Sequence, residues 1–206
     1  MKIKNILYVA SSSASRKMLL TMSKIPFVVI GQTADESLVD PSLRLEDQVT
    51  FIAQLKMEHV QLDAGSYEGE IRFVLTADTM GCDGQENVHG KPVDREDAYR
   101  KIRLLTAGSY RTATAFCIEI KHWERGAWIM KKSECQVVSS TYSFKVPENR
   151  MEDYFENSPA LNVSGAIAVE DYGLQFLEKI EGSYSTIVGL PLYEVRTTLE
   201  KFGFFQ

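Results

Sequence analysis

Two segments of the chain combine residue types that bind phosphate or activate water. The first is residues 10–20, Ala-Ser-Ser-Ser-Ala-Ser-Arg-Lys-Met-Leu-Leu, where a hydroxyl-rich turn leads into a helix that carries Arg16. Free N–H groups at a helix start and the helix dipole favour anions, and hydroxyl and guanidinium groups add donors. A helix capped by Ser13 or Ser15, with a solvated arginine, explains the same residues. This segment by itself leaves both interpretations open.

The second segment, Thr76-Ala77-Asp78-Thr79, places an acid where an apolar strand predicted over 71–77 ends. In open α/β sheets, ligands gather outside the carboxyl ends of the strands. A carboxylate there can bind a hard divalent cation or orient an attacking water molecule. A simple turn aspartate is the alternative.

Two lysines and one further acid complete the set of candidates. Lys91 lies between a glycine and a proline just ahead of a predicted helix, which suits contact with a phosphate, although a solvated turn lysine is the alternative. Lys56 interrupts the apolar stripe of a helix predicted over 45–62, so it points either to solvent or into a cleft. Glu36 lies in a polar stretch after the second predicted strand.

The elements that must position these residues alternate between strands and helices, as is typical of an α/β domain. The predicted strands are 3–10, 27–30, 71–77, 111–121 and 128–144, and the predicted helices are 16–22, 45–62, 96–105, 148–157 and 192–202. A turn near Gly126 predicts that the last two strands are antiparallel. We therefore expect a single domain over 1–206, with a mixed sheet, helices on both sides and two lobes around a cleft.

Composition narrows the function classes. The net charge of -5 argues against a nucleic-acid partner, but it does not exclude a small polyanion. No apolar stretch reaches the roughly 20 residues of a membrane helix, and the apolar run at the N-terminus is short for a signal peptide. Cys82, Cys117 and Cys135 are far apart and predict free thiols in a reducing cytosol. We therefore expect a cytoplasmic protein that binds neither membrane nor nucleic acid.

Order and spacing add what the single motifs lack. The series Ala-Ser-x-Ser-x-x-Arg, Asp-Glu, Lys, Ala-Asp-Thr and Gly-Lys-Pro is followed by Ile-Glu-Gly-Ser-Tyr-Ser-Thr-Ile-Val-Gly-Leu-Pro at 180–191. In this order the chain resembles the Maf family of nucleotide pyrophosphatases over nearly its whole length. The resemblance implies an ITPase-like (Maf) α/β fold with a twisted mixed sheet and a deep cleft, assembled as a homodimer. It also implies hydrolysis of a nucleoside triphosphate between the α- and β-phosphates, assisted by Mg²⁺, Mn²⁺ or a similar ion.

The resemblance also implies a role for each candidate residue. Ser13 and Arg16 fall on positions that hold the phosphate chain, and Lys56 and Lys91 fall on lysines that face the phosphates. Glu36 and Asp78 fall on acidic positions associated with metal binding and activation of water. Asp78 is thereby the leading candidate for general base or metal ligand.

The chain departs from the family pattern at two places that bear on activity and substrate. The usual Ser-Pro-Arg-Arg is replaced by Ser13-Ala14-Ser15-Arg16, without the proline and the first arginine. Glu170 stands where one branch of the family has Gln and favours dTTP and UTP; the branch with Glu favours 7-methyl-GTP. Glu170 and Ser15 indicate the second branch, whereas residues 77–79 are closer to the first, so the preferred base is left open.

Two other functions are compatible with the sequence. The altered loop at 13–16 favours a non-catalytic Maf-like regulator of septum formation and cell division, although the retained acids and lysines argue against it. A phosphatase with Ser13 or Cys82 as covalent nucleophile is the other. However, no Cys-x5-Arg loop surrounds Cys82, and the three histidines form no recognisable motif.

Overall fold

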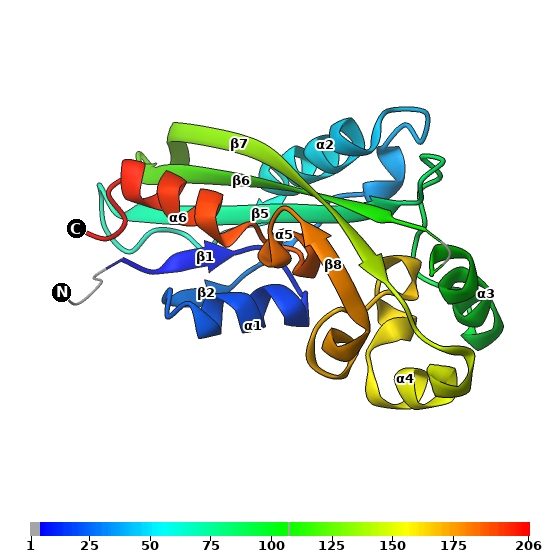
Figure 1. The fold of residues 1–206 in the computed structure, drawn as a ribbon. Coiled ribbons are helices and arrows are strands. Elements are labelled where there is room, and N and C mark those ends of the chain that lie inside the picture. The colour runs from blue at the N-terminus through cyan, green and yellow to red at the C-terminus, as the bar shows by residue number, and fades with distance from the viewer. Residues whose placement is uncertain (1–4, 107) are drawn as a thin grey trace. The chain divides into compact units, whose positions relative to one another are not determined.

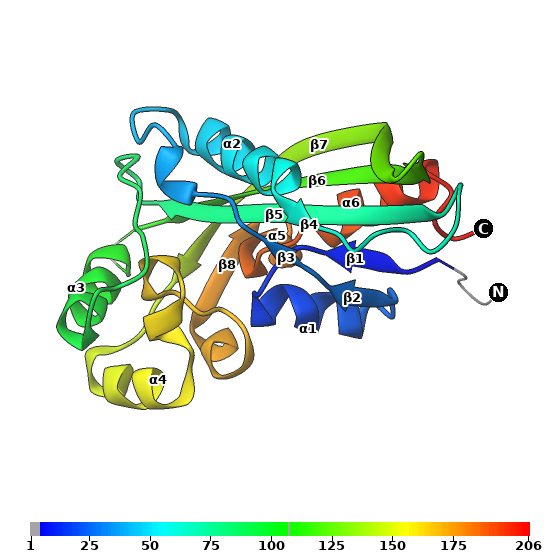
Figure 2. The ribbon, with the colours of Figure 1, turned by 180° about the vertical axis from the view of Figure 1, so that it is seen from behind.

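The computed structural model describes residues 5–106 and 108–206 and contains a six-stranded mixed sheet with helices around it (Figures 1 and 2). The sheet has the order β2-β1-β5-β6-β7-β8, and β3 and β4 form a separate antiparallel pair. The strands are β1 (Leu7–Val9), β2 (Phe27–Val29), β3 (Gly31–Gln32), β4 (Val60–Gln61), β5 (Ile71–Cys82), β6 (Tyr110–Glu124), β7 (Ala127–Phe144) and β8 (Leu177–Glu181). The helices are α1 (Ala14–Met22), α2 (Leu45–Glu58), α3 (Arg95–Leu105), α4 (Met151–Asn157), α5 (Tyr184–Val188) and α6 (Leu192–Lys201). The predicted α/β class is confirmed.

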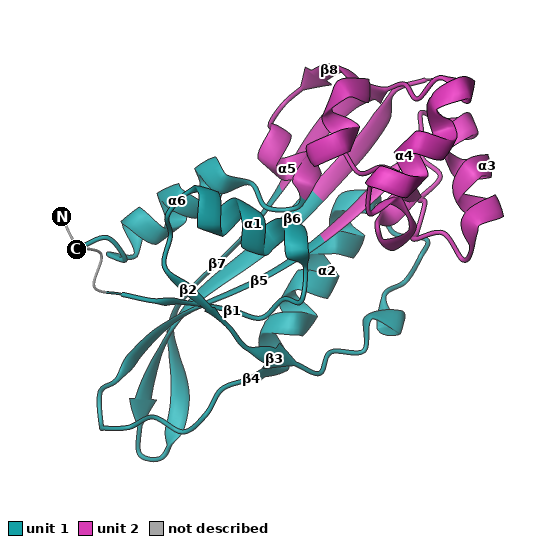
Figure 3. Ribbon diagram, turned by 90° about the horizontal axis from the view of Figure 1, so that it is seen from below, with its two compact units in different colours: residues 1–78, 114–137, 189–206 teal, residues 79–113, 138–188 magenta. Residues whose placement is uncertain are grey.

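The chain divides into two compact units, coloured separately in Figure 3. Unit 1 comprises residues 1–78, 114–137 and 189–206, and unit 2 comprises residues 79–113 and 138–188. The expected arrangement of two lobes around a deep cleft stays a prediction.

Unit 1 is built around β1, which lies between two parallel neighbours. Leu7 and Val9 of β1 are almost fully buried and pair in register with β2 on one side and with β5 on the other. A strand enclosed in this way reads as an apolar run, which is the pattern that predicted it. Helices α1 and α6 lie on one side of this part of the sheet and α2 lies on the other (Figure 3).

Several predicted boundaries differ from the structure, among them the strand predicted over 3–10, of which the described part is β1 (Leu7–Val9) while residues 3 and 4 lie outside the described residues. Two further differences have a tertiary cause. The strand expected to end at Ala77 continues as β5 to Cys82, so Asp78 lies inside a strand. The helix expected to reach Leu62 ends at Glu58, because Val60 and Gln61 pair with β3 instead. In each case pairing with a strand far along the chain decides where the element stops, and local sequence does not encode that partner.

Unit 2 has an aromatic core between α3, α4 and the second half of β7. Tyr154 lies at its centre, with ring centroids 5.6 Å from Phe144 and 5.7 Å from Phe176. Its hydroxyl donates to the carbonyl of Ala166 at 2.8 Å and accepts from the amide of Ala168 at 2.7 Å. This residue is therefore a core side chain that holds residues 166–168 in place.

A disulfide corrects the prediction of three free thiols. Strands β6 and β7 are neighbours joined by a two-residue turn, Arg125–Gly126, in which both φ angles are positive, at 53° and 80°. This hairpin brings the Cα atoms of Cys117 and Cys135 within 4.1 Å, and the two sulfurs are bonded. Cys82 is buried and forms no disulfide. The spacing of Cys117 and Cys135 along the chain does not predict this disulfide, because the register of β6 on β7 is what brings the two residues together.

Three free thiols were one of the reasons to expect a cytoplasmic protein, and the disulfide removes that reason. The cytoplasmic location stays a prediction. None of the helices formed by residues 5–106 and 108–206 has the length and apolar character to cross a bilayer.

Reducing the Cys117–Cys135 bond should lower the free energy of unfolding by about 3 kcal/mol, the chain-entropy value for a closed loop of this length. Urea unfolding with and without a thiol reductant measures the difference. The control is a Cys117→Ala/Cys135→Ser double variant, whose midpoint the reductant should not move. An unchanged midpoint for the wild-type protein would contradict the prediction.

Candidate functional site

The centre of the candidate site is the buried ammonium group of Lys56. Its Nζ lies 2.7 Å from Oδ1 of Asp78 and 3.0 Å from Oε1 of Glu36. The side chains of Lys56 and Asp78 are only 9% and 11% exposed, whereas that of Glu36 is 49% exposed. One cation therefore holds two carboxylates together, one enclosed by protein and one open to solvent.

The packing of α2 on β5 explains why Lys56 meets Asp78. Side chains two apart on a strand share a face, so Thr76 and Asp78 both point toward α2. The buried hydroxyl of Thr76 donates to the carbonyl of Ala53 at 2.7 Å, which fixes the helix against the strand. Lys56 follows Ala53 by three positions on the same helix face and thus reaches the next inward side chain of β5.

Glu36 reaches the same ammonium group from a short 3-10 helix, η1 (Glu36–Leu38). Asp35 caps this helix, with its carboxylate accepting from the amide and the hydroxyl of Ser37 at 3.1 and 2.6 Å. These two bonds lower the pKa of Asp35 and keep it as an acceptor. The cap fixes the turn that aims Glu36 at Lys56.

Arg16 is the second buried cation of unit 1. Its Nε donates to the carbonyl of Gly189 at 2.8 Å, and its Nη1 donates to Oγ of Ser11 at 3.1 Å. Burial lowers the pKa of Arg16, while the negative charges of Asp78 and Glu36 act in the opposite direction. The solvated arginine allowed by the sequence is thus wrong, and Arg16 belongs electrostatically to the Lys56 cluster.

Ser13 has the structural role that the sequence allowed for it. Its Oγ accepts from the amide of Arg16 at 3.3 Å and caps α1. A bond this long is weak, and Ser13 is half-buried at the start of the helix. The hydroxyl remains at the end of a helix where anions are favoured, as a phosphate contact requires.

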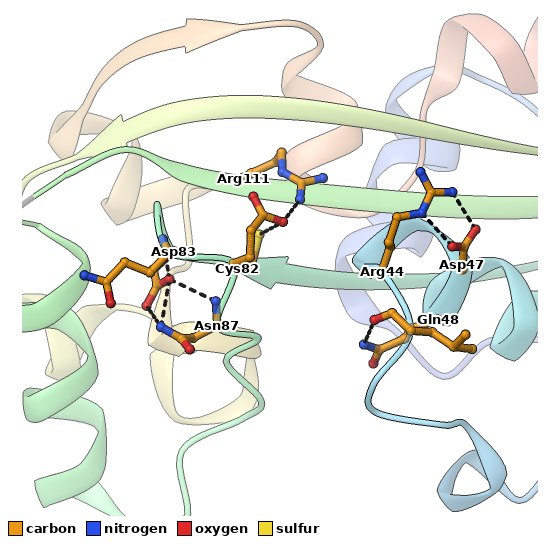
Figure 4. A network of polar contacts seen from close by, with 10 residues as sticks. Arg44, Asp47, Gln48, Cys82, Asp83, Asn87 and Arg111 are labelled. Atoms are coloured by element: carbon orange, nitrogen blue, oxygen red, sulfur yellow. Dashed lines mark hydrogen bonds and ion pairs between the residues drawn. The ribbon is translucent and has the colours of Figure 1, made fainter.

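Lys91, in unit 2, follows a loop organised by Asp83. The Asp83 carboxylate accepts from Nε2 of His89 at 2.9 Å and from the amide of Gln85 at 2.9 Å. It also accepts from the amide of Asn87 at 3.0 Å (Figure 4). Burial by itself raises the pKa of Asp83, but these hydrogen bonds outweigh it and lower the pKa to about 2. The Lys91 side chain, two residues beyond His89, is exposed.

Glu170 is a buried acid in unit 2, with 7% of its surface exposed. It precedes the 3-10 helix η5 (Asp171–Phe176) and follows the segment that Tyr154 holds. Burial raises the pKa of Tyr184, and the negative charge of Glu170 raises it further. The carboxylate of Glu170 therefore acts electrostatically on nearby aromatic hydroxyls.

Comparison with known proteins decides the family. A family model described as Maf-like protein matches residues 6–202. A protein named dTTP/UTP pyrophosphatase from Hydrogenovibrio crunogenus is 30% identical over 205 residues, which cover 99% of this chain and 100% of that protein. The chain belongs to the Maf family.

Further Maf relatives match at similar identity. A dTTP/UTP pyrophosphatase from Geotalea uraniireducens is 32% identical over 204 residues, covering 98% of each chain. A nucleoside triphosphate pyrophosphatase from Ehrlichia canis is 29% identical over 203 residues, again covering 98% of each chain.

Of the predicted site residues of this Maf protein, the fold of unit 1 brings four into one cluster: Arg16, Glu36, Lys56 and Asp78. Ser13 starts the helix that carries Arg16, and Lys91 and Glu170 belong to unit 2. The sequence reasoning missed the anchoring of Arg16 on Gly189. The signal in the sequence is a glycine directly before Leu-Pro, and in the structure this Gly189 has a φ of 119°, which favours glycine.

The donor set suits a magnesium-like ion that substrate phosphates help to bind. Glu36 and Asp78 present carboxylate oxygens within reach of one ammonium group. Within the described part of the chain, no group of three or more His, Cys, Asp or Glu side chains is arranged to hold a metal ion. Mg²⁺ is commonly bound by one or two carboxylates together with substrate phosphates and water. The two acids fit this mode of binding better than a complete protein cage.

Asp83→Asn should reduce the free energy of unfolding by about 2 kcal/mol near neutral pH, given a native pKa of about 2 against 3.8 in the unfolded chain. Because the folded pKa is depressed, this stabilisation is present above pH 4 and is lost as the pH falls toward 2. Urea titrations between pH 7 and pH 2 should show the difference between the two proteins narrowing as the pH falls. A constant difference across this range would assign the loss to packing instead.

Proposed function

We propose that this Maf protein hydrolyses nucleoside triphosphates between the α- and β-phosphates to a nucleoside monophosphate and pyrophosphate. The observation that carries the proposal is the Lys56 ammonium held between Asp78 and Glu36, with Arg16 buried nearby. Relatives that align over almost the entire chain bear the names dTTP/UTP pyrophosphatase and nucleoside triphosphate pyrophosphatase.

In the proposed reaction Asp78 acts as general base. Lys56 binds Oδ1 of Asp78 and orients the carboxylate, which has further acceptor positions on both oxygens. A water proton moves to this carboxylate, the water oxygen bonds to phosphorus, and the bond to the leaving pyrophosphate breaks with its electron pair. The arrangement is that of an oriented base beside fixed positive charge.

Two buried cations stabilise the negative charge that develops on the leaving pyrophosphate in the proposed reaction. Arg16 and Lys56 are hydrogen-bonded or ion-paired and largely removed from water, so they stabilise developing phosphate charge more strongly than solvated cations do. We assign Ser13 and Lys91 as further phosphate contacts. Glu36 and Asp78 would hold a divalent ion such as Mg²⁺ or Mn²⁺, which supplies charge neutralisation on the phosphates.

The proposed substrates are dTTP and UTP, as in the names of the relatives. Glu170 supports a second candidate, 7-methyl-GTP, because a buried carboxylate accepts hydrogen bonds from the N–H donors of a guanine edge, whereas an amide both donates and accepts. Assembly as a homodimer remains part of the proposal, on the resemblance to the family.

The first experiment is a pyrophosphate-release assay with Mg²⁺ or Mn²⁺ on wild-type protein and Asp78→Asn. General bases contribute roughly 10²- to 10⁴-fold, so turnover should fall by about that factor in the variant. The matched control is Asp47→Asn, an exposed acid on the same helix as Lys56 that pairs with Arg44 (Figure 4), and its turnover should stay unchanged.

Three outcomes would separate the alternatives. Near-normal turnover of a folded Asp78→Asn protein would remove Asp78 from the mechanism. Nucleotide binding without product from folded wild-type protein would support the non-catalytic regulator. Stepwise release of orthophosphate, without pyrophosphate, would indicate a phosphatase.

Glu170→Gln should raise the ratio of kcat/KM for dTTP to that for 7-methyl-GTP by about tenfold, the scale of one or two altered hydrogen bonds in a binding site. The control is Asp171→Asn, which changes the neighbouring exposed carboxylate and should leave the ratio unchanged. The ratio is measured by competition between the two substrates in one reaction. An unaltered ratio for Glu170→Gln would take this residue out of base selection.

A further inference from the structure

A second buried lysine, Lys101 on α3, makes contacts that the proposed reaction does not use. Its Nζ donates to the carbonyl of Gly90 at 3.0 Å and to the carbonyl of Lys91 at 3.1 Å. It also lies 2.9 Å from Oδ2 of Asp97. The side chain of Lys101 is only 9% exposed.

These contacts use the full bonding capacity of the group. An ammonium has three N–H donors and no acceptor, and here each of the three has a partner. Burying such a charge is costly unless it is paired and hydrogen-bonded, so removing either side leaves a strongly polar group unsatisfied. Two of the three partners are successive backbone carbonyls, and bonding both fixes the peptide units on the two sides of the Lys91 Cα atom.

Other bonds hold the same loop from both ends. Oδ2 of Asp97 accepts from the amide of Val93 at 3.1 Å, and the amide of Gly165 donates to the carbonyl of Gly90 at 3.1 Å. The loop 90–93 is thus tied to α3 at three backbone atoms, two through Lys101 and one through Asp97. The Lys91 side chain extends from this fixed backbone and is exposed.

We propose that Lys101 is a positioning residue that fixes the backbone of Gly90 and Lys91, so that the Lys91 ammonium group meets the substrate phosphates in one orientation. This inference rests on the proposed function, in which Lys91 contacts the phosphates. A lysine on a mobile backbone loses far more freedom on binding than one on a fixed backbone, and small misplacements are costly in catalysis. An apolar side chain at position 101 would fill the same volume but would bind neither carbonyl.

The test is a double-mutant cycle between Lys101→Met and Lys91→Ala, measured as kcat/KM for pyrophosphate release and as the dissociation constant of inorganic pyrophosphate. Lys101→Met alone should lower kcat/KM about tenfold and raise the dissociation constant of pyrophosphate about tenfold, in line with the cost of misplacing a binding group. In the Lys91→Ala background the same change should have less than about a twofold effect, because coupled residues are not additive.

Two further variants serve as controls for the double-mutant cycle. Arg100→Met removes another partner of Asp97 without touching the loop, so it should leave both constants unchanged. Lys101→Arg keeps a cation with several donors and should recover part of the affinity. Urea unfolding of each variant shows whether it is folded under the assay conditions.

The outcomes are distinct. The positioning role would be overturned if Lys101→Met changed kcat/KM and pyrophosphate affinity equally with and without Lys91, or if it changed neither. The wild-type protein could also be inactive while Lys101→Met weakens pyrophosphate binding only when Lys91 is present. This result would overturn the proposed hydrolysis and support the positioning role. Lys91→Ala without effect on either constant would overturn both the assignment of Lys91 and the role of Lys101.

Discussion

The buried ammonium of Lys56 is the interaction on which the candidate site depends. Without this cation, the carboxylates of Glu36 and Asp78 would repel one another, and the enclosed Asp78 would lack its nearest positive partner. The hydrogen bond from Thr76 to the carbonyl of Ala53 fixes the position of α2 along β5, and this position brings Lys56 next to Asp78. The site is therefore a consequence of one helix docked on one strand, with Glu36 added from a capped turn.

Arg16 extends the same electrostatic arrangement to the start of the chain. Its guanidinium joins the turn at Ser11 to the carbonyl of Gly189, two segments far apart in sequence, and feels the charge of both acids. The result is alternating positive and negative groups that are mostly removed from water. Such a cluster suits the proposed binding of a polyanion with a divalent ion, since its charges are already oriented.

Unit 2 uses a related device for a different purpose. In α3, as in α2, a lysine occupies a position on the buried face, three residues after a buried alanine. Lys56 meets two carboxylates and orients Asp78 in the proposed reaction, whereas Lys101 meets two backbone carbonyls and one carboxylate and is proposed to fix the backbone at Lys91. The same sequence signal thus precedes two roles, and the side chains opposite the helix decide between them.

The sequence by itself determined the family, the α/β class and most helix starts, because these depend on periodicity, capping residues and motif order. It also identified Arg16, Glu36, Lys56 and Asp78, whose residue types suit phosphate chemistry. Only the tertiary structure decided that Lys56 bridges the two acids, that β5 runs on past Asp78, and that Cys117 and Cys135 are joined. Each of these depends on contact between segments distant along the chain, set by strand register and helix docking, and local residue patterns do not record which distant segment will be the partner.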